Sequence, residues 1–264
     1  MQNIKTNTAT LILLLLVLSL PICTLAQNQR INERNLTGWG TINLDWNLNS
    51  KWGIHLDLNQ RRVNISGNFY QHLYRTGMNY KPNDKLYFRA GYVLARTSPF
   101  GDIQAATAHQ TSTEHRSYEM VTFTDRSGNL ETSHRLGLEQ RWNSKFSNPD
   151  LNSSDSWAYT NRARYRLRFD YAFRKKNNQT SYPYIFIYDE VMVNFGKQVN
   201  SNVFDQNRTG LFTGYAFSKI TKLEIGFMNQ VFQLSKKYYN NTVFQNNRNL
   251  MINLMFNIPS GKFN

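Results

Sequence analysis

Apolar and polar residues alternate with a period of two along most of the chain, from Trp39 onward. Near the start, Ile42 and Leu44 fall on one face of an extended segment, and Asn43 and Asp45 fall on the other. Such alternation is typical of β-strands that have one apolar and one polar face. Because no segment shows a competing helical period, the sequence predicts an all-β protein.

Eleven segments carry this pattern, and they span residues 39–48, 52–61, 68–80, 85–97, 114–124, 130–142, 157–171, 182–195, 206–218, 222–234 and 247–258. Short connections alternate with long ones that are rich in Asn, Ser and Thr; the long ones are 98–113, 143–156, 196–205 and 235–246. Short periplasmic turns and longer external loops are typical of outer-membrane barrels. We therefore expect a single antiparallel transmembrane β-barrel.

The number of strands depends on where the chain enters the barrel. The first of the eleven segments leads into a short turn, which is expected on the periplasmic side, so that segment would begin on the external side. An exported chain, however, delivers its N-terminus to the periplasm. An extra crossing in residues 27–38 would give twelve strands, although this segment could instead run through the lumen. We expect about twelve strands, with ten as the alternative.

A soluble barrel or sandwich would show the same alternation, because its apolar faces would fill the core. Strand length favours a membrane barrel, because a tilted strand of about ten residues spans a bilayer, whereas strands in soluble proteins average about five or six residues. Aromatic residues towards the strand ends also fit interfacial girdles; examples are Trp39, Trp46, Trp52, Trp142 and Trp157.

The first segment has the features of an export signal. Lys5 precedes an apolar core at residues 11–20, and small residues lead up to Ala26. We expect cleavage after Ala26, which makes 1–26 a signal peptide and 27–264 the barrel domain. The alternatives are a membrane anchor, for which the core is short, and a lipoprotein lipidated at Cys23, where Ile22 is too large. After cleavage the mature chain has no cysteine, which excludes disulfides and thiolate metal sites.

Composition excludes other classes. The chain has 264 residues, 40% of them hydrophobic, and a mean hydropathy of -0.58. After residue 20 no apolar run approaches the roughly 18 residues that a membrane helix needs, and 14% aromatic residues are too many for a disordered polymer. The formal net charge is +14, but the basic residues are spread along strands and turns, so no nucleic-acid partner is expected.

Four arginines alternate along the segment 157–171. An arginine that faces lipid near the midplane costs about 2–4 kcal/mol, so this face should point into the lumen. The same reasoning predicts a set of lumen-lining charges that are structural or determine selectivity: Asp57, Arg61, Arg75, Arg89, Glu119, Arg135, Glu139, Arg141, Arg162, Arg164, Arg166, Arg168, Asp170, Glu190, Arg208 and Glu224. Pairing across 125–129 would set Glu119 opposite Arg135 and His115 opposite Glu139.

Several short motifs recur in order over nearly the whole mature chain: Trp39 before Lys51-Trp52, Arg61-Arg62, Gly77-Met78-Asn79-Tyr80, Gly91-Tyr92, Glu119, the run from Arg135 to Arg141, Arg162-Ala163-Arg164 and Glu190. Their order and spacing resemble domain of unknown function family 2490, an uncharacterised family of Gram-negative, Bacteroidota-type outer-membrane barrel proteins. The resemblance implies a barrel in the outer membrane. It supplies no catalytic residue, ligand or transported solute.

Three functions fit such a lumen. Arginine–carboxylate pairs could pack into a ladder, giving a non-conducting structural barrel or scaffold. A surplus of arginine could instead line a narrow porin-like channel for small, anionic solutes. An outer-membrane lipid hydrolase or protease would need His115, Ser117 and Glu139 together. We expect the channel, with no enzyme activity, cofactor or metal, and with outer-membrane lipid and small solutes as partners.

Overall fold

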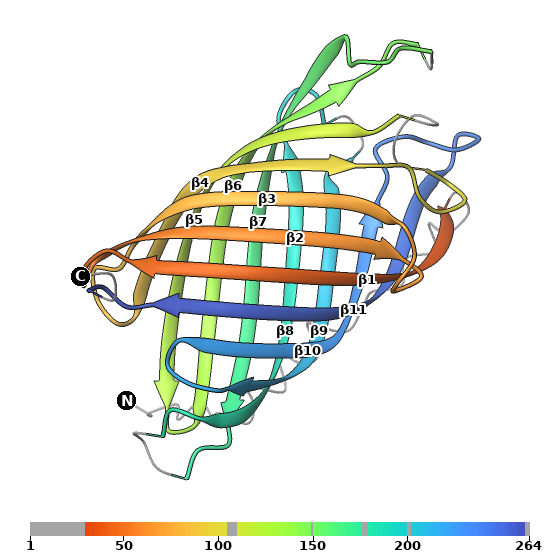
Figure 1. The fold of residues 1–264 in the computed structure, drawn as a ribbon. Helices are drawn as coiled ribbons and strands as arrows, with labels where there is room; N and C mark the ends of the chain where they lie inside the picture. The colour runs from red at the N-terminus through yellow and green to blue at the C-terminus, as the bar shows by residue number, and fades with distance from the viewer. Residues whose placement is uncertain (1–29, 105–109, 149, 176–178, 200–201, 262–264) are drawn as a thin grey trace, which may run out of the picture.

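The strands of the chain close into a single barrel (Figure 1). The computed structural model describes residues 30–104, 110–148, 150–175, 179–199 and 202–261, so the expected signal peptide lies outside the described residues. The eleven strands in these residues are β1 (Arg30–Asn47), β2 (Trp52–Val63), β3 (Phe69–Tyr80), β4 (Leu86–Thr97), β5 (Ser112–Ser127), β6 (Leu130–Lys145), β7 (Ser156–Ala172), β8 (Tyr182–Phe195), β9 (Phe204–Ala216), β10 (Thr221–Gln233) and β11 (Thr242–Ile258). The prediction of an all-β barrel is confirmed.

The described residues form eleven strands, close to the expected number of about twelve. Residues 30–38 do not make a separate crossing, because they extend the first strand. This extension pairs in parallel with β11, from Arg30 opposite Thr242 to Trp46 opposite Ile258. All other neighbouring strands pair antiparallel. An odd number of strands makes the first and last run in the same direction, and their parallel ladder closes the barrel.

The two ends of the barrel differ in their connections. We call the end of the barrel where β1 and β11 finish the turn end. The connections at this end are 48–51, 81–85, 128–129, 173–181 and 217–220. The opposite loop end carries 64–68, 98–111, 146–155, 196–203 and 234–241. The expected asymmetry is therefore present, except that the connection 64–68 is short and 173–181 is long. The hairpin between β5 and β6 is tighter than expected, with only Gly128 and Asn129 between the paired strands.

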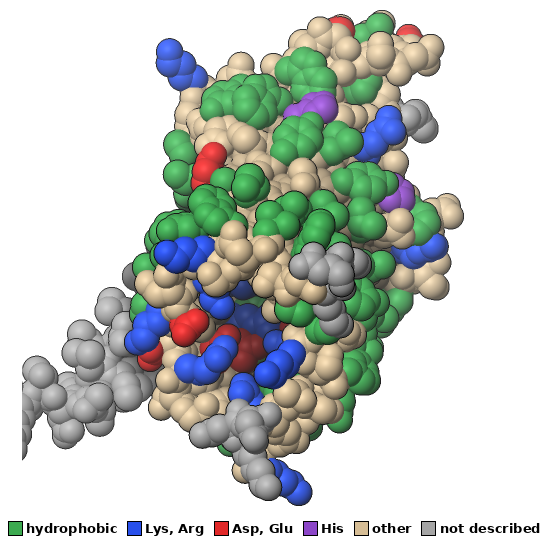
Figure 2. All heavy atoms as spheres, turned by 60° about the vertical axis from the view of Figure 1, so that its left-hand side comes forward, with side chains coloured by type: hydrophobic (Ala, Val, Ile, Leu, Met, Phe, Trp, Pro, Cys, Tyr) green, Lys and Arg blue, Asp and Glu red, His purple; other side chains and the backbone are tan. Residues whose placement is uncertain are grey.

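The outer face of the barrel is apolar. Large side chains such as Leu136, Leu211 and Phe227 are 56%, 62% and 71% exposed, and hydrophobic residues cover much of the flank in Figure 2. The inner face holds buried charges, among them Glu139 and Arg162 at 3% exposure. This arrangement is the inverse of a soluble barrel, whose apolar faces fill the interior. Within the described part of the chain, no helix is long and apolar enough to span a membrane.

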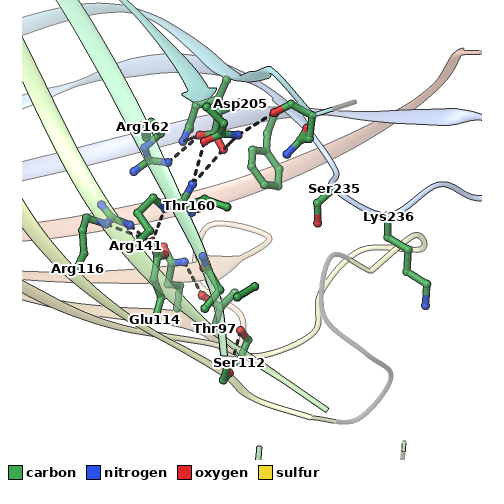
Figure 3. A pocket seen from close by; sticks show the side chains of 18 of the residues that line it. Thr97, Ser112, Glu114, Arg116, Arg141, Thr160, Arg162, Asp205, Ser235 and Lys236 are labelled. Carbon is green, nitrogen blue, oxygen red and sulfur yellow. Dashed lines mark hydrogen bonds and ion pairs between the residues drawn. The ribbon is translucent and has the colours of Figure 1, made fainter. Parts of the chain in front are cut away.

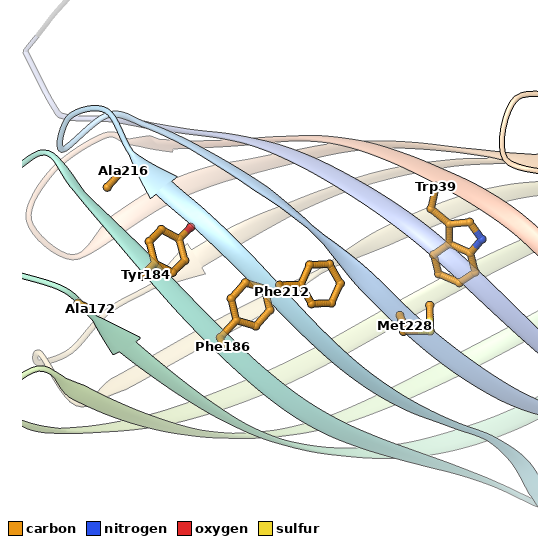
Figure 4. Close-up of a cluster of buried hydrophobic side chains, with 7 residues drawn as sticks. All are labelled: Trp39, Ala172, Tyr184, Phe186, Phe212, Ala216 and Met228. Carbon is orange, nitrogen blue, oxygen red and sulfur yellow. The ribbon is translucent and has the colours of Figure 1, made fainter.

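Part of the interior is nevertheless apolar. A cluster of inward side chains runs along β8, β9 and β10 and reaches β1 (Figure 4); it consists of Trp39, Ala172, Tyr184, Phe186, Phe212, Ala216 and Met228. The rings of Phe186 and Phe212 stack with centroids 4.7 Å apart. The lumen thus has an aromatic wall on β8–β10 and a charged wall centred on β5–β7, a division that the sequence did not predict.

Candidate functional site: the charged lumen

Two cavities lie in the lumen. The larger has a volume of about 790 Å³ and is lined by residues such as Glu114, Arg116 and Asp205 (Figure 3). The smaller, of about 160 Å³, is lined by both charged and aromatic side chains, including Arg166 and Phe186. Five side chains line both cavities, so the two adjoin: Arg61, Leu73, Arg75, Arg164 and Arg208. We treat the two cavities and the charges around them as the candidate site.

Strand β7 presents its arginines inward because they alternate at the two-residue period of a strand. Arg162 and Arg164 lie beside Glu139 of β6, at N–O distances of 2.5 and 2.6 Å. Arg116 of β5 reaches the same carboxylate from the other side, at 3.3 Å. Glu139 therefore contacts three guanidinium groups, one from β5 and two from β7.

The ion pairs continue from Glu139 into a single network across β5–β9. Arg164 also donates to Glu190 at 2.9 Å, and Arg135 donates to the same oxygen at 2.7 Å. Arg162 donates to Asp205 at 2.7 Å. The full set, which we call the central network, is Glu114, Arg116, Arg135, Glu139, Arg141, Arg162, Arg164, Glu190 and Asp205. It joins four carboxylates to five guanidinium groups, and such forked contacts fix both position and orientation.

Further ion pairs lie outside the central network. Arg168 donates to Asp170 at 2.5 Å and to Glu224 at 3.1 Å. Two more pairs on the inner face are Arg75 with Asp57 and Arg89 with Asp45, at 2.9 and 2.7 Å. These contacts bring charges from neighbouring strands together on the inner surface.

Three arginines of the candidate site take no part in an ion pair. Ten arginines line the two cavities, and of these Arg61, Arg166 and Arg208 have no carboxylate within 4.0 Å among the residues that the structure describes. Arg61 lies over the ring of Trp39, with its guanidinium carbon 3.5 Å from the centroid, and Arg208 lies 5.2 Å from it. The candidate site therefore carries uncompensated positive charge.

The structure places thirteen of the fourteen primary candidate residues on the inner face, and it also places Arg208 and Glu224 there. The exception is Glu119, which is exposed on the outer face and accepts a hydrogen bond from Gln140. The expected register was wrong as well, because Glu119 lies opposite Leu138 and Glu139 opposite Tyr118. The cause is the tight β5–β6 turn, which shifts every pairing from the one expected across 125–129.

The hydrolase constellation does not assemble. His115 and Ser117 lie on the outer face of β5, whereas Glu139 is buried in the lumen on the other side of the sheet. The hydroxyl of Ser117 donates to Gln140 at 2.6 Å, and His115 contacts the hydroxyl of Tyr92. No group of three or more His, Cys, Asp or Glu side chains suited to a metal occurs in the described ranges.

Three charged members of the central network were not among the lumen charges expected from the sequence. Glu114 and Arg116 were not among the expected lumen charges, because Glu119 on the opposite face of β5 was placed inside; both faces of this strand are polar, and the alternation alone does not choose between them. Asp205 was placed in a loop, but β9 begins at Phe204 and includes it. The signal that could have found the first two is Val121 and Phe123, which share a face with Ser117 and Glu119. Phe123 is exposed on the outer face, so Glu114 and Arg116 on the opposite face point inward.

Taken together, the inverted barrel and the arginine-rich lumen define a β-barrel protein with a charged interior. The family model that matches residues 36–241 is described as protein of unknown function, DUF2490. The match covers most of the chain, so the chain belongs to this family. No curated protein matches it.

Proposed function

We propose that the protein is an outer-membrane β-barrel that forms a narrow passage for small anionic solutes. The observation that carries the proposal is the inverted distribution of side chains, with apolar residues outside and a surplus of arginine inside. The apolar outer face supports insertion in the membrane, and the surplus of arginine in the lumen supports a preference for anionic solutes.

Strand length and surface chemistry support insertion in a bilayer. The strands contain 12 to 18 residues, and about 9–11 residues are enough to cross when tilted. Trp46 and Trp52 are exposed near the turn end, and Trp142 and Trp157 are exposed near the loop end. Tryptophan at both borders of an apolar band is typical of interfacial girdles. The aliphatic residues between these borders would contact acyl chains.

The charge of the lumen supports a preference for anions. Two of the three unpaired arginines, Arg61 and Arg208, line both cavities, and Arg166 lines the smaller one. Fixed positive charge at these positions lowers the entry barrier for an anion. Figure 2 shows the turn-end face hollowed, with acidic and basic side chains within it. At the loop end, Phe100 of the connection after β4 lines the larger cavity, and its ring packs on that of Tyr70 with centroids 4.0 Å apart. The amides of Asp102 and Ile103 donate to Glu33 of β1.

A non-conducting structural barrel is the second candidate. The central network and the aromatic wall both favour it, because each fills interior volume with side chains in contact. In that case the lumen would act as the core of the protein, and its arginine surplus would have no transported partner.

Planar-bilayer recordings of the purified protein separate the two candidates. The passage predicts discrete conductance steps and, under a salt gradient, a reversal potential of the sign for anion selectivity. A variant with Arg248→Gln, which removes an exposed charge from the outer face, should behave as wild type. Absence of steps, or selectivity for cations, would overturn the proposed passage.

A further inference from the structure

The smaller cavity contains more guanidinium groups than its carboxylates can pair. Seven arginines and three carboxylates line it. Asp57 pairs with Arg75, and Glu224 pairs with Arg168. Glu190 is shared by two further members of the set, Arg135 and Arg164. All three carboxylates are therefore engaged, and the remaining arginines are Arg61, Arg166 and Arg208.

Neutral groups hold two of these arginines in place. The Nε of Arg61 donates to Asn59 at 2.9 Å, and the Nε of Arg208 donates to Gln206 at 3.0 Å. Both side chains also lie against Trp39. Orientation through Nε leaves the two terminal nitrogens of each fork as donors for another group. The amides and the indole thus set the geometry without neutralising the charge.

Arg166 adds a donor that the protein itself does not satisfy. Its Nε is buried, and no hydrogen-bond partner for it occurs in the described residues. Its register partner in β8 is Glu190, but that carboxylate accepts from other arginines. Buried donors are normally hydrogen-bonded, so an unsatisfied one needs an explanation. An acceptor that enters the cavity would supply it.

Physical chemistry favours an oxoanion as that acceptor. Three like charges in one cavity repel one another, and the repulsion grows where apolar walls lower the local dielectric. Phe212 and Met251 contribute such walls here. Guanidinium forks match the oxygen pairs of carboxylates and phosphates. The volume of the cavity is about 160 Å³, which suits a small ion rather than a large solute.

We propose that Arg61, Arg166 and Arg208 form a binding site for a small oxoanion of the carboxylate or phosphate class, beside Trp39 in the smaller cavity. The site deepens the proposed passage by giving it a defined binding step, and it rests on the lumen being reachable by solutes. Bound anion would accept from the three forks and compensate the surplus charge. The aromatic wall would exclude larger species.

Isothermal titration of the purified barrel in detergent tests the site, with inorganic phosphate and acetate as separate probes. At least one of them should bind saturably, and the probe that binds identifies the class. A double variant with Arg166→Gln and Arg208→Gln should weaken binding by roughly tenfold or more, because it removes charge-assisted hydrogen bonds. The matched Arg248→Gln variant should bind as wild type. Equal binding by wild type and double variant, or no saturable binding of either probe, would overturn the site.

Thermal unfolding keeps the test decisive if the double variant is less stable. The bound probe should raise the Tm of the wild type and leave that of the double variant unchanged, since a ligand stabilises only the form that binds it. Equal Tm increases in both proteins would contradict the site. Anion-selective conductance without saturable binding would refute the site and keep the passage. Saturable binding without conductance would support the site and refute the passage.

Discussion

Glu139 shows how a single residue can organise the charged wall. It is 3% exposed and contacts Arg116, Arg162 and Arg164. A buried carboxylate with several charge-assisted bonds compensates guanidinium groups that would otherwise repel one another. The contribution of the residue is therefore larger than that of a surface ion pair, which is worth about 0–1 kcal/mol.

Replacing this carboxylate by a neutral amide should destabilise the barrel. We expect Glu139→Gln to lower the free energy of unfolding by about 3–5 kcal/mol, because it leaves buried charge uncompensated. Asp84→Asn is the control, since Asp84 is exposed in the connection 81–85 outside the strands, and it should change stability by about 0.5 kcal/mol or less. Denaturant midpoints measured in detergent compare the two. Similar midpoints for both variants would contradict this account.

At the scale of elements, the aromatic wall depends on close contact between β9 and β10. The inward position Gly226 lies beside Phe212, and an added Cβ would come within 2.5 Å of Phe212 Cγ and still closer to the carbonyl oxygen of Leu211. Glycine in a strand interior often marks such close approach. The ring of Phe212 occupies the space that a side chain at position 226 would need, so the position of the ring depends on the glycine.

A larger side chain at this position should disturb the wall. We expect Gly226→Val to cost about 1–3 kcal/mol, because overpacking displaces neighbouring side chains and backbone. Gly40→Val is the control, since nothing lies within 4 Å of a Cβ at that outer position. Unfolding midpoints give the comparison. A variant at Gly226 as stable as the one at Gly40 would show that the ring moves aside at little cost.

Element boundaries and faces were predictable where one face is plainly apolar. In β7 the alternation of arginine with Ala163, Tyr165 and Leu167 fixed the inner face correctly. It failed in β5, where polar residues occupy both faces, and at residues 30–38, whose polar sequence gives no strand signal. Pairing with β11 makes that segment a strand. Tertiary hydrogen bonding overrides weak local preference there.

For the whole molecule, the sequence predicted a barrel with arginine inside but not how the interior divides. The period of two shows which side chains share a face, and the lipid or water around the barrel then determines whether the apolar face points outward or inward. It does not reveal which residues from distant strands meet, so the central network and the aromatic wall emerge only from closure of the sheet. Closure also brings Arg208 of β9 to 5.2 Å from the ring of Trp39 of β1, on which Arg61 of β2 packs.

The membrane environment of the whole barrel can be tested from its outer face. Leu136 lies near the middle of β6 and is 56% exposed. In a bilayer, Leu136→Arg should cost about 2–4 kcal/mol, whereas Leu130→Arg at the turn end of the same strand should cost about 0–1 kcal/mol. The free energy of unfolding from lipid vesicles measures both. If water surrounds the outer face, the two variants should differ little, because exposed arginine is then well hydrated. The depth dependence therefore reports on lipid at the outer face independently of conductance through the lumen.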